Sequence, residues 1–586
     1  MIGPWPKDFD DPRGTAVQPM ASLLQITHAS ATWNHHGLEK KKTGRRGRIG
    51  LNRDWYCEQM EITVKALPNH PHGQEIIDLI ARAISLRHEK RHEEALGCLE
   101  EAVFIDPKFF PVLVEKGIIL FELTRYEEAI ECFDLFLKFT GNSQVRELRD
   151  SCLKHALATC DRTLAGDKPN VELLLKRGDI LQRLHRFDDA VYTYNLALEI
   201  YVNNMVEVIN RRGNALLNLN RPEEALESYN RALELSPRNA FLLYNRANVL
   251  QKLSSMDEAL ESYGRALAYE PGLAEAKMEQ SHCRLRMGDY RRGFQEYESR
   301  WETTVLKSVK LASPKPLWLG EETLAGKTIL LWAEQGFGDA IQFLRYVPLV
   351  AQTAGRTILR VPTLLKSLAQ TLDCPVSVIT FEELPPHDFN CPLMSLPLAF
   401  GTTLESIPSA VPYLRSKPDR VEKWRNELGP RTRPRIGLVW AGRRREPINL
   451  TRDMDLEVLA PLTHLDVEII SLQKEIPDQD KTVLESMPQI TRLGEKLSDF
   501  EETAALIENL DMVISVDTVV AHLAGALGKP VWIMLRHSGE WRWLLNRNDS
   551  PWYPTARIFR QQKPGDWAGV VGDITQQLQA RMDPSR

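Results

Sequence analysis

The residues best suited to chemistry lie where an apolar run gives way to a helical pattern. In WAEQGFGDAIQFLRYVPLV (332–350), Asp339 follows Gly336 and Gly338. A helix opening there presents unpaired N–H groups and a partial positive charge, which suit a phosphate. An aspartate at that place is either a helix cap or a general base, and the pattern alone favours the cap. The third glycine of a dinucleotide fingerprint and the lysine of a P-loop are both missing.

A second transition of this kind lies in MVISVDTVVAHLAGALGKPVWIML, residues 512–535. Asp517 and Thr518 end an apolar run, and either residue is expected to cap the helix that begins at once. His522 follows one turn into that helix, whose N-terminus suits a diphosphate. Lys529 is expected to complement a helix end rather than to contact a phosphate.

A third candidate is the arginine-rich segment at 441–455. Guanidinium groups match phosphate oxygens, and Arg452 is the one predicted to contact the ligand, whereas 443–445 are expected to be solvated. Asp453 and Asp455 form the D-x-D pattern of some metal sites. Because they open the helical segment DLEVLAPL, capping is the simpler interpretation, and no metal is expected.

The elements that precede these segments are helical repeats. From about residue 74, small residues recur with steps of 34, 61, 35, 34 and 34, and a second series follows twelve residues later. Aromatic residues lie between the two series. A helix pair of about 34 residues needs small side chains where its helices cross, and this is the tetratricopeptide pattern. The two series are Ala83, Gly117, Gly178, Gly213, Ala247 and Ser281, then Ala95, Ala129, Ala190, Ala225, Ala259 and Gly293.

The spacing predicts a solenoid over 74–303 with about six clear repeats and one degenerate, shortened unit near 141–170. After Trp301, short apolar runs alternate with helical segments, which indicates parallel β-α-β sheets. We expect a first Rossmann-like lobe at 318–415 and a second at 432–575, which face a cleft. Ligands of such sheets bind beyond the carboxyl ends of the strands. The fold class is therefore α + α/β.

An aromatic cluster lies in EWRWLLNRNDSPWYP, residues 540–554. Its large rings can stack on a base or a sugar, or they can line the hinge between the lobes. The rings belong to Trp541, Trp543, Trp552 and Tyr553.

Composition narrows the class of protein. The chain has 586 residues, 43% hydrophobic content and a net charge of -5, which favours neither nucleic-acid nor anionic-membrane binding. No stretch reaches the roughly 18 apolar residues of a spanning helix. Eight scattered cysteines and the lack of a secretory signal predict a cytoplasmic address. Residues 1–70, with the basic run at 40–48, are expected to be poorly ordered.

Several segments together carry a resemblance to a known family: EQGFGDAIQFLRYVPLVA, CPLMSLPLAFGT, DTVVAHLAGALGKPVW and WRWLLNRNDSPWYPTARIFRQ. From about residue 74 onwards the chain resembles bacterial tetratricopeptide proteins with a C-terminal glycosyltransferase-like domain. That domain is similar to the ADP-heptose–lipopolysaccharide heptosyltransferases of the GT-B fold. The first lobe is short for a heptosyltransferase.

The resemblance implies inverting, metal-independent sugar transfer from a nucleotide-diphosphate sugar to a hydroxyl acceptor of a protein or an envelope glycan. It assigns Asp339 as general base and places Asp517, Thr518 and His522 at the donor. Gly336, Gly338 and Arg452 complete the predicted donor site. No cofactor is implied beyond this donor substrate, and the repeats are expected to bind a protein or peptide.

Two alternatives stay open. Protein O-GlcNAc transferase also carries repeats, but its asparagine ladder is represented here only by Asn245, with Lys176 and Arg211 at the equivalent positions. The other alternative is a scaffold whose transferase lobe no longer catalyses and whose function resides in the repeats. An active glycosyltransferase and such a scaffold differ in whether the C-terminal half binds and turns over a sugar nucleotide.

Overall fold

The computed structural model describes residues 72–106, 109–139, 142–166, 170–200, 205–381, 384–442 and 453–582. The basic run at 40–48 and Arg452 lie outside these ranges. The chain divides into two compact units, Met1–Ser228 and Tyr229–Arg586. The second unit contains the last repeats together with both lobes.

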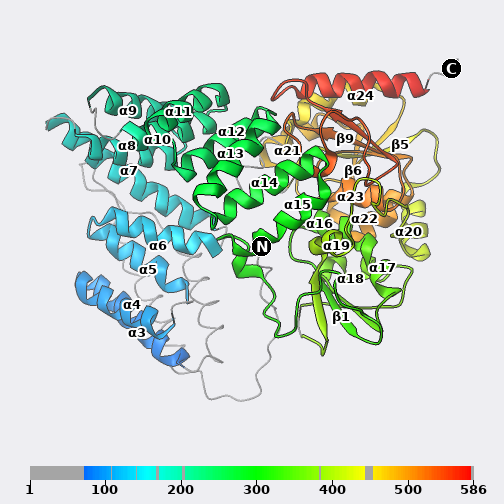
Figure 1. The fold of residues 1–586 in the computed structure, drawn as a ribbon, viewed down its shortest axis with the longest axis horizontal. Coiled ribbons are helices and arrows are strands. Elements are labelled where there is room, and N and C mark those ends of the chain that lie inside the picture. Colours follow the sequence, from blue (N-terminus) through cyan, green and yellow to red (C-terminus); the bar gives the residue numbers. More distant parts are fainter. Residues whose placement is uncertain are drawn as a thin grey trace, which may run out of the picture. The chain divides into compact units, whose positions relative to one another are not determined.

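The repeats form helices that follow one another as adjacent pairs (Figure 1). Their bounds are α3 Gly73–His88, α4 His92–Ile105, α5 Pro111–Glu122, α6 Tyr126–Phe139, α7 Ser143–Gly166, α8 Val171–Arg183, α9 Phe187–Ile200, α10 Met205–Asn218, α11 Pro222–Leu235, α12 Ala240–Lys252, α13 Met256–Tyr269, α14 Ala274–Met287 and α15 Tyr290–Tyr297. The degenerate, shortened unit predicted near 141–170 is the single 24-residue helix α7.

Packing within the repeats explains the periodic small residues. A Cβ built on Gly117 would lie 2.6 Å from Phe133, and one on Gly178 would lie 2.4 Å from Tyr194. Both aromatic rings are fully buried. The two helices of a pair can therefore approach only where a small residue meets the ring, as the repeat pattern predicts.

Two parallel sheets follow, as the alternation of apolar runs predicts. The first has the order β3-β2-β1-β4 and the second the order β10-β9-β8-β5-β6-β7. The strands are β1 Thr328–Trp332, β2 Arg356–Arg360, β3 Val376–Ile379, β4 Phe389–Pro392, β5 Arg435–Val439, β6 Glu468–Ser471, β7 Ile490–Arg492, β8 Met512–Val516, β9 Val531–Leu535 and β10 Ala556–Arg560. The sequence pattern missed β4, β7 and β10, which are short or mixed in polarity.

Helices connect the strands. The α-helices are α16 Phe337–Phe343, α17 Val347–Ala351, α18 Thr363–Ala369, α19 Leu396–Ala399, α20 Pro418–Leu428, α21 Asp478–Glu485, α22 Phe500–Glu508, α23 Val519–Ala526 and α24 Trp567–Met582. The 3-10 helices are η1 Glu298–Glu302, η2 Lys307–Val309, η3 Leu344–Tyr346, η4 Leu393–Ser395, η6 Leu456–His464, η7 Gly494–Lys496 and η8 Trp541–Trp543. Among the helices that the structure describes, none is long and apolar enough to cross a membrane.

One hydrophobic core joins the end of the repeats to both lobes. It runs from Tyr290 and Phe294 of α15, through the first lobe, to α23 and one side of the second sheet. The other side of that sheet has a separate core beneath η6 and α24. The last repeat is therefore built into the same compact unit as the lobes.

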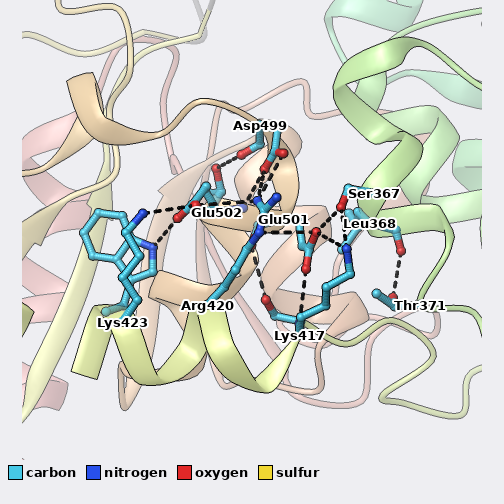
Figure 2. A network of polar contacts seen from close by, with 12 residues as sticks. Ser367, Leu368, Thr371, Lys417, Arg420, Lys423, Asp499, Glu501 and Glu502 are labelled. Carbon is cyan, nitrogen blue, oxygen red and sulfur yellow. Dashed lines mark hydrogen bonds and ion pairs between the residues drawn. The ribbon is translucent and has the colours of Figure 1, made fainter. Parts of the chain in front are cut away.

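The helix α20, which leads from the first lobe to the second, is held by a charged network (Figure 2). Arg420 donates to Asp499 at 2.9 Å, and Lys423 donates to Glu502 at 3.2 Å. The fully buried Glu501 accepts a hydrogen bond from Ser367 of α18 in the first lobe. Because the carboxylates lie at the start of α22, this network joins the two lobes beside their connecting helix.

Candidate functional site

The turn between β1 and α16 positions Asp339. Gly336 is the N-cap residue, and Asp339, at the third position of the helix, accepts its backbone N–H at 3.0 Å through Oδ2. The aspartate therefore caps by reaching back along the chain, instead of occupying the cap position itself. Its role as general base stays a prediction.

Asp339 also has a cationic partner that the sequence did not reveal. Arg542 of η8 forms an ion pair with Asp339 Oδ1, and its Nε donates to Gln342 Oε1 at 2.7 Å. Burial lowers the pKa of Arg542. The sequence signal that could have indicated this partner is the arginine between two tryptophans in WRW, but the sequence analysis considered only the aromatic rings of this segment. The structure thus places an arginine from the second lobe on the predicted base.

At Gly338 the starts of the two predicted helices, α16 and α23, come together. A Cβ built on Gly338 would lie 2.9 Å from His522 Cδ2 and 3.7 Å from Val519 Cα. The start of α16 therefore meets the start of α23 directly, and only a residue without a side chain fits there. Asp339, Gly338 and His522 share one neighbourhood, as the predicted site requires.

The second opening is buried and well packed. Asp517 and His522 are 6% and 4% exposed. His522 Nδ1 lies 3.0 Å from the Tyr553 hydroxyl, and Nε2 lies 3.9 Å from Asp517 Oδ1. The ring stacks on Trp543 with centroids 5.3 Å apart. The imidazole is thus held in one orientation beside the aspartate.

Thr518 is the N-cap residue of α23 by position, but its side chain makes no capping hydrogen bond. Its hydroxyl lies 2.9 Å from Ser515 Oγ instead. A capping role for the Thr518 side chain is therefore wrong, because the hydroxyl of the preceding strand residue competes for it.

Lys529 serves a structural purpose. Its Nζ donates to the carbonyls of Glu508 at 2.7 Å and Leu510 at 3.3 Å, where α22 ends. Carbonyls at a helix end favour a cation. The charge complements the end of α22, as a helix-end role predicts.

The arginine-rich segment gives a mixed outcome. Arg452 and 443–450 lie outside the described residues, so that part of the donor prediction stays a prediction. Asp453 accepts the N–H of Gly442 at 2.7 Å. Asp455 precedes η6, a 3-10 helix, without a side-chain capping bond, so the expected cap of an α-helix is wrong. In the described part of the chain, no cluster of three or more metal-binding side chains occurs.

The aromatic cluster lines the junction of the lobes. Trp541, Trp543, Trp552 and Tyr553 are all buried, none more than 3% exposed. Trp552 donates through Nε1 to the Tyr290 hydroxyl of α15 at 2.9 Å. These rings pack against the repeat and the first lobe, which agrees with the hinge interpretation.

Two protein families match parts of the chain. A tetratricopeptide repeat family matches residues 213–254, and "Glycosyltransferase family 9 (heptosyltransferase)" matches residues 473–563. The chain joins tetratricopeptide repeats to a family 9 glycosyltransferase segment. The resemblance expected from the sequence is confirmed. The family 9 segment contains Asp517, His522 and Arg542, whereas Asp339 lies before it.

Three individual proteins also match parts of the chain. Protein FlbA of Caulobacter vibrioides is 26% identical over 334 residues, which cover 52% of this chain and 55% of that protein. The chain thus spans about half the length of the curated relative. ADP-heptose lipopolysaccharide heptosyltransferase II of E. coli is 15% identical, with 43% of this chain and 98% of that chain covered and a TM-score of 0.34. A family 9 glycosyltransferase of Veillonella parvula is 11% identical, with 44% and 97% covered and a TM-score of 0.33.

Proposed function

We propose that the protein is a glycosyltransferase that moves a sugar from a nucleoside-diphosphate donor to a hydroxyl acceptor. The observation that carries this proposal is the contact of the Asp339 turn with the opening of α23, inside a chain with a family 9 match. One side of the contact supplies a carboxylate. The other supplies a helix N-terminus, which favours the charge of a diphosphate.

The proposed transfer is a single displacement. The acceptor oxygen forms a bond to the anomeric carbon, while the bond from that carbon to the diphosphate oxygen breaks and its electron pair leaves with the nucleoside diphosphate. The acceptor proton passes to the Asp339 carboxylate. The inverting, metal-independent course is taken from the resemblance, and the acceptor is a protein or an envelope glycan hydroxyl.

The repeats would recruit the acceptor or a protein partner in the cytoplasm. Lys176 forms an ion pair with Glu127, and Arg211 forms ion pairs with Asp179 and Glu207. These positions carry charged pairs where the asparagine ladder of protein O-GlcNAc transferase would stand. The arm is therefore expected to select its peptide by charge rather than by amide contacts.

A scaffold without catalysis is the second candidate function, and one observation favours it. Both oxygens of Asp339 are engaged, one by the Gly336 N–H and one by Arg542. A base must release one of them before it can accept a proton. A relic of a transferase would keep these contacts because they cap α16 and join the lobes.

Calorimetric titration of the full chain with UDP-, ADP- and GDP-sugars separates the two. We expect saturable binding of one donor, and the Asp517→Ala variant should weaken it because Asp517 orients His522 at the α23 opening. Lys529→Met, which alters only the end of α22, is the control. Failure of every donor to bind would favour the scaffold.

A further inference from the structure

The helical repeats end in a short segment that contacts the loop before Asp339. This segment consists of Tyr297, the last residue of α15, and of η1, which follows it. Trp301 of η1 packs on Trp332, the last residue of β1, with ring centroids 5.5 Å apart. Gln335 donates through Nε2 to the Tyr297 hydroxyl at 2.8 Å. The end of the repeats therefore holds both sides of the segment that leads from β1 to the Asp339 turn.

Arg300 of η1 makes the central contact of this junction. The side chain is fully buried, and Nη1 donates to Glu298 Oε1 at 2.6 Å. Nη2 donates to Ser395 Oγ at 2.7 Å and to Glu334 Oε1 at 3.3 Å. The same Glu334 oxygen accepts the N–H of Met394 at 3.1 Å. One guanidinium thus joins the end of the repeats to the loop after β1 and to η4.

The junction lies at the edge of the first sheet where ligands are expected. β1 and β4 are parallel neighbours, with Trp332 beside Pro392. Glu334 follows the carboxyl end of β1, and Ser395 follows that of β4. Ligands of parallel sheets bind beyond these strand ends. Arg300 therefore fixes two neighbouring loops at the same edge as Asp339.

The contacts of Arg300 favour a fixed geometry more than they favour stability. Replacement of a buried ion pair by apolar side chains is often neutral or stabilising. Here Arg300 Nε and Glu334 Oε2 also lack hydrogen-bond partners among the residues that the structure describes. The guanidinium lies over the rings of Tyr297 and Trp301, 4.7 and 4.4 Å from their centroids. A planar fork held in this way fixes the direction of each bond that it makes.

A short turn connects the anchored side chains to Asp339. Ala333 still donates its N–H to the last carbonyl of β2 at 3.0 Å, and the Gly336 N–H donates to Asp339 Oδ2 at 3.0 Å. Between these two backbone contacts, Glu334 and Gln335 are held through their side chains. A shift of this pair therefore moves Gly336 and, through its N–H, the carboxylate. A misplacement of about 1 Å can slow a reaction about 100-fold.

We propose that Arg300 and Tyr297 are positioning residues, which hold Glu334 and Gln335 so that the Asp339 carboxylate meets the acceptor hydroxyl. The task assigned to Asp339 rests on the proposed function, whereas the hold on the loop rests on the contacts of η1 and α15. Neither positioning residue is placed at the reacting atoms. The end of the repeat arm then serves the transfer step itself and not only recruitment.

Arg300→Lys in the full chain tests this role. Lysine keeps the buried charge, but one ammonium group cannot reproduce the fork that reaches Glu298, Ser395 and Glu334. The probes are UDP-, ADP- and GDP-glucose with water as the acceptor. The kcat for release of the nucleoside diphosphate should fall about tenfold or more, because the carboxylate is displaced. The KM for the donor should stay within about twofold, because the donor is assigned to α23.

Two further changes sharpen the kinetic test. Arg284→Lys is the matched control, because Arg284 of α14 pairs with Glu296 and Asp289 inside the last repeat, and both constants should be kept. Tyr297→Phe removes one hydroxyl and should lower kcat with KM unchanged. Addition of Gln335→Met should lower kcat no further, because both changes break the same hydrogen bond.

Hydrogen exchange measures the hold on the loop without any substrate. Arg300→Lys should speed amide exchange of residues 333–339 about tenfold or more and leave that of α23 as in the wild type. A purely structural arginine would instead speed exchange throughout the first lobe and leave kcat unchanged. Tyr297→Phe carries the same test if Arg300→Lys does not fold.

The outcomes separate this inference from the proposed function. If the wild type hydrolyses a donor, and Arg300→Lys and Tyr297→Phe change neither kcat nor exchange at 333–339, the positioning role is wrong and the transferase stands. If the wild type neither binds nor hydrolyses any donor, but Arg300→Lys speeds exchange at 333–339 alone, the hold on the loop stands and the transferase fails. Where a donor binds without hydrolysis, exchange at 333–339 decides.

Discussion

The ends of two strands, β1 in the first lobe and β10 in the second, carry opposite kinds of unsatisfied atom. After β1, Glu334 is buried and its Oε2 has no hydrogen-bond partner among the described residues. At β10, Arg560 and Gln561 leave donors without acceptors. An unpaired carboxylate oxygen can bind a proton, whereas an unpaired N–H donor needs a hydrogen-bond acceptor. The carboxyl of the first lobe can therefore lose its charge by binding a proton, whereas the guanidinium of the second lobe keeps its charge.

The neighbourhood of Glu334 supports this contrast. Its Oε1 accepts the N–H of Met394 at 3.1 Å and lies 3.3 Å from Arg300, which is fully buried. Burial raises the pKa of Glu334 to about 7, although Arg300 opposes the shift. At neutral pH this carboxyl is therefore protonated in about half of the molecules. Glu334 lies five residues before Asp339, in the segment between β1 and α16.

The strongest way to test the contrast is to remove the predicted base. Asp339→Asn keeps an oxygen for the Gly336 N–H but cannot take the acceptor proton, so the rate of sugar transfer should fall about 100- to 10,000-fold. Donor affinity should persist, because the diphosphate is assigned to the second lobe. Steady-state transfer assays and titration of the donor measure the two effects. Transfer at the wild-type rate would show that Asp339 is only a cap.

A second prediction concerns how protonation of Glu334 makes the stability of the protein depend on pH. Its pKa rises from 4.5 in the unfolded chain to about 7 in the folded one, so the folded state binds the proton more tightly. The resulting stability is fully present below pH 4.5 and is lost as the pH rises through about 7. Glu334→Gln should abolish this loss, worth about 3 kcal/mol at about 1.4 kcal/mol per pKa unit.

Denaturation of the wild type and of Glu334→Gln at pH 4.5 and pH 8 measures the difference. Glu422→Gln on α20 is the control, because Glu422 is exposed and pairs with the exposed Arg425. An equal response to pH in the wild type and in Glu334→Gln would mean that the pKa of Glu334 is the same in the folded and in the unfolded chain.

The smallest effect concerns the contact between the lobes. Gly338→Ala places a Cβ 2.9 Å from His522, so α16 and α23 must separate, at a cost of about 1–3 kcal/mol in unfolding free energy. Gly336→Ala is the matched control. Its Cβ would meet only the Asp339 carboxylate, at 3.1 Å, and its φ of -64° suits alanine. Thermal denaturation measures the stability of the two variants, and titration measures their donor affinity. Equal stability and affinity in the two variants would mean that Gly338 is not part of the site.

Much of the fold could be predicted because its signals are local. The recurring small residues reported the crossing points of the helix pairs, where Gly117 meets Phe133. The buried strands of the sheets read as apolar runs, as in MVISV. The strand β7 has two exposed residues of three, so it left no such run. The degenerate unit near 141–170 was recognised from the longer step in the repeat, but spacing alone cannot show that this unit is one long helix.

The candidate site was only partly accessible from the sequence. Asp339 and His522 were identified by their places after strands, but their closeness depends on the packing of α16 on α23. Arg542 pairs with Asp339 across 203 positions of the chain. No local pattern records such a pair, so the sequence did not reveal it.

The sequence by itself determined the repeats, the two parallel sheets and the strand–turn–helix positions of Asp339 and Asp517. Local spacing sets these features, because a helix pair needs its small residues and a buried strand needs its apolar ones. Only the tertiary structure decided which charges meet. A carboxylate acquires its partner, and a buried donor lacks one, through burial of segments distant in the chain, where desolvation makes each unpaired polar group costly.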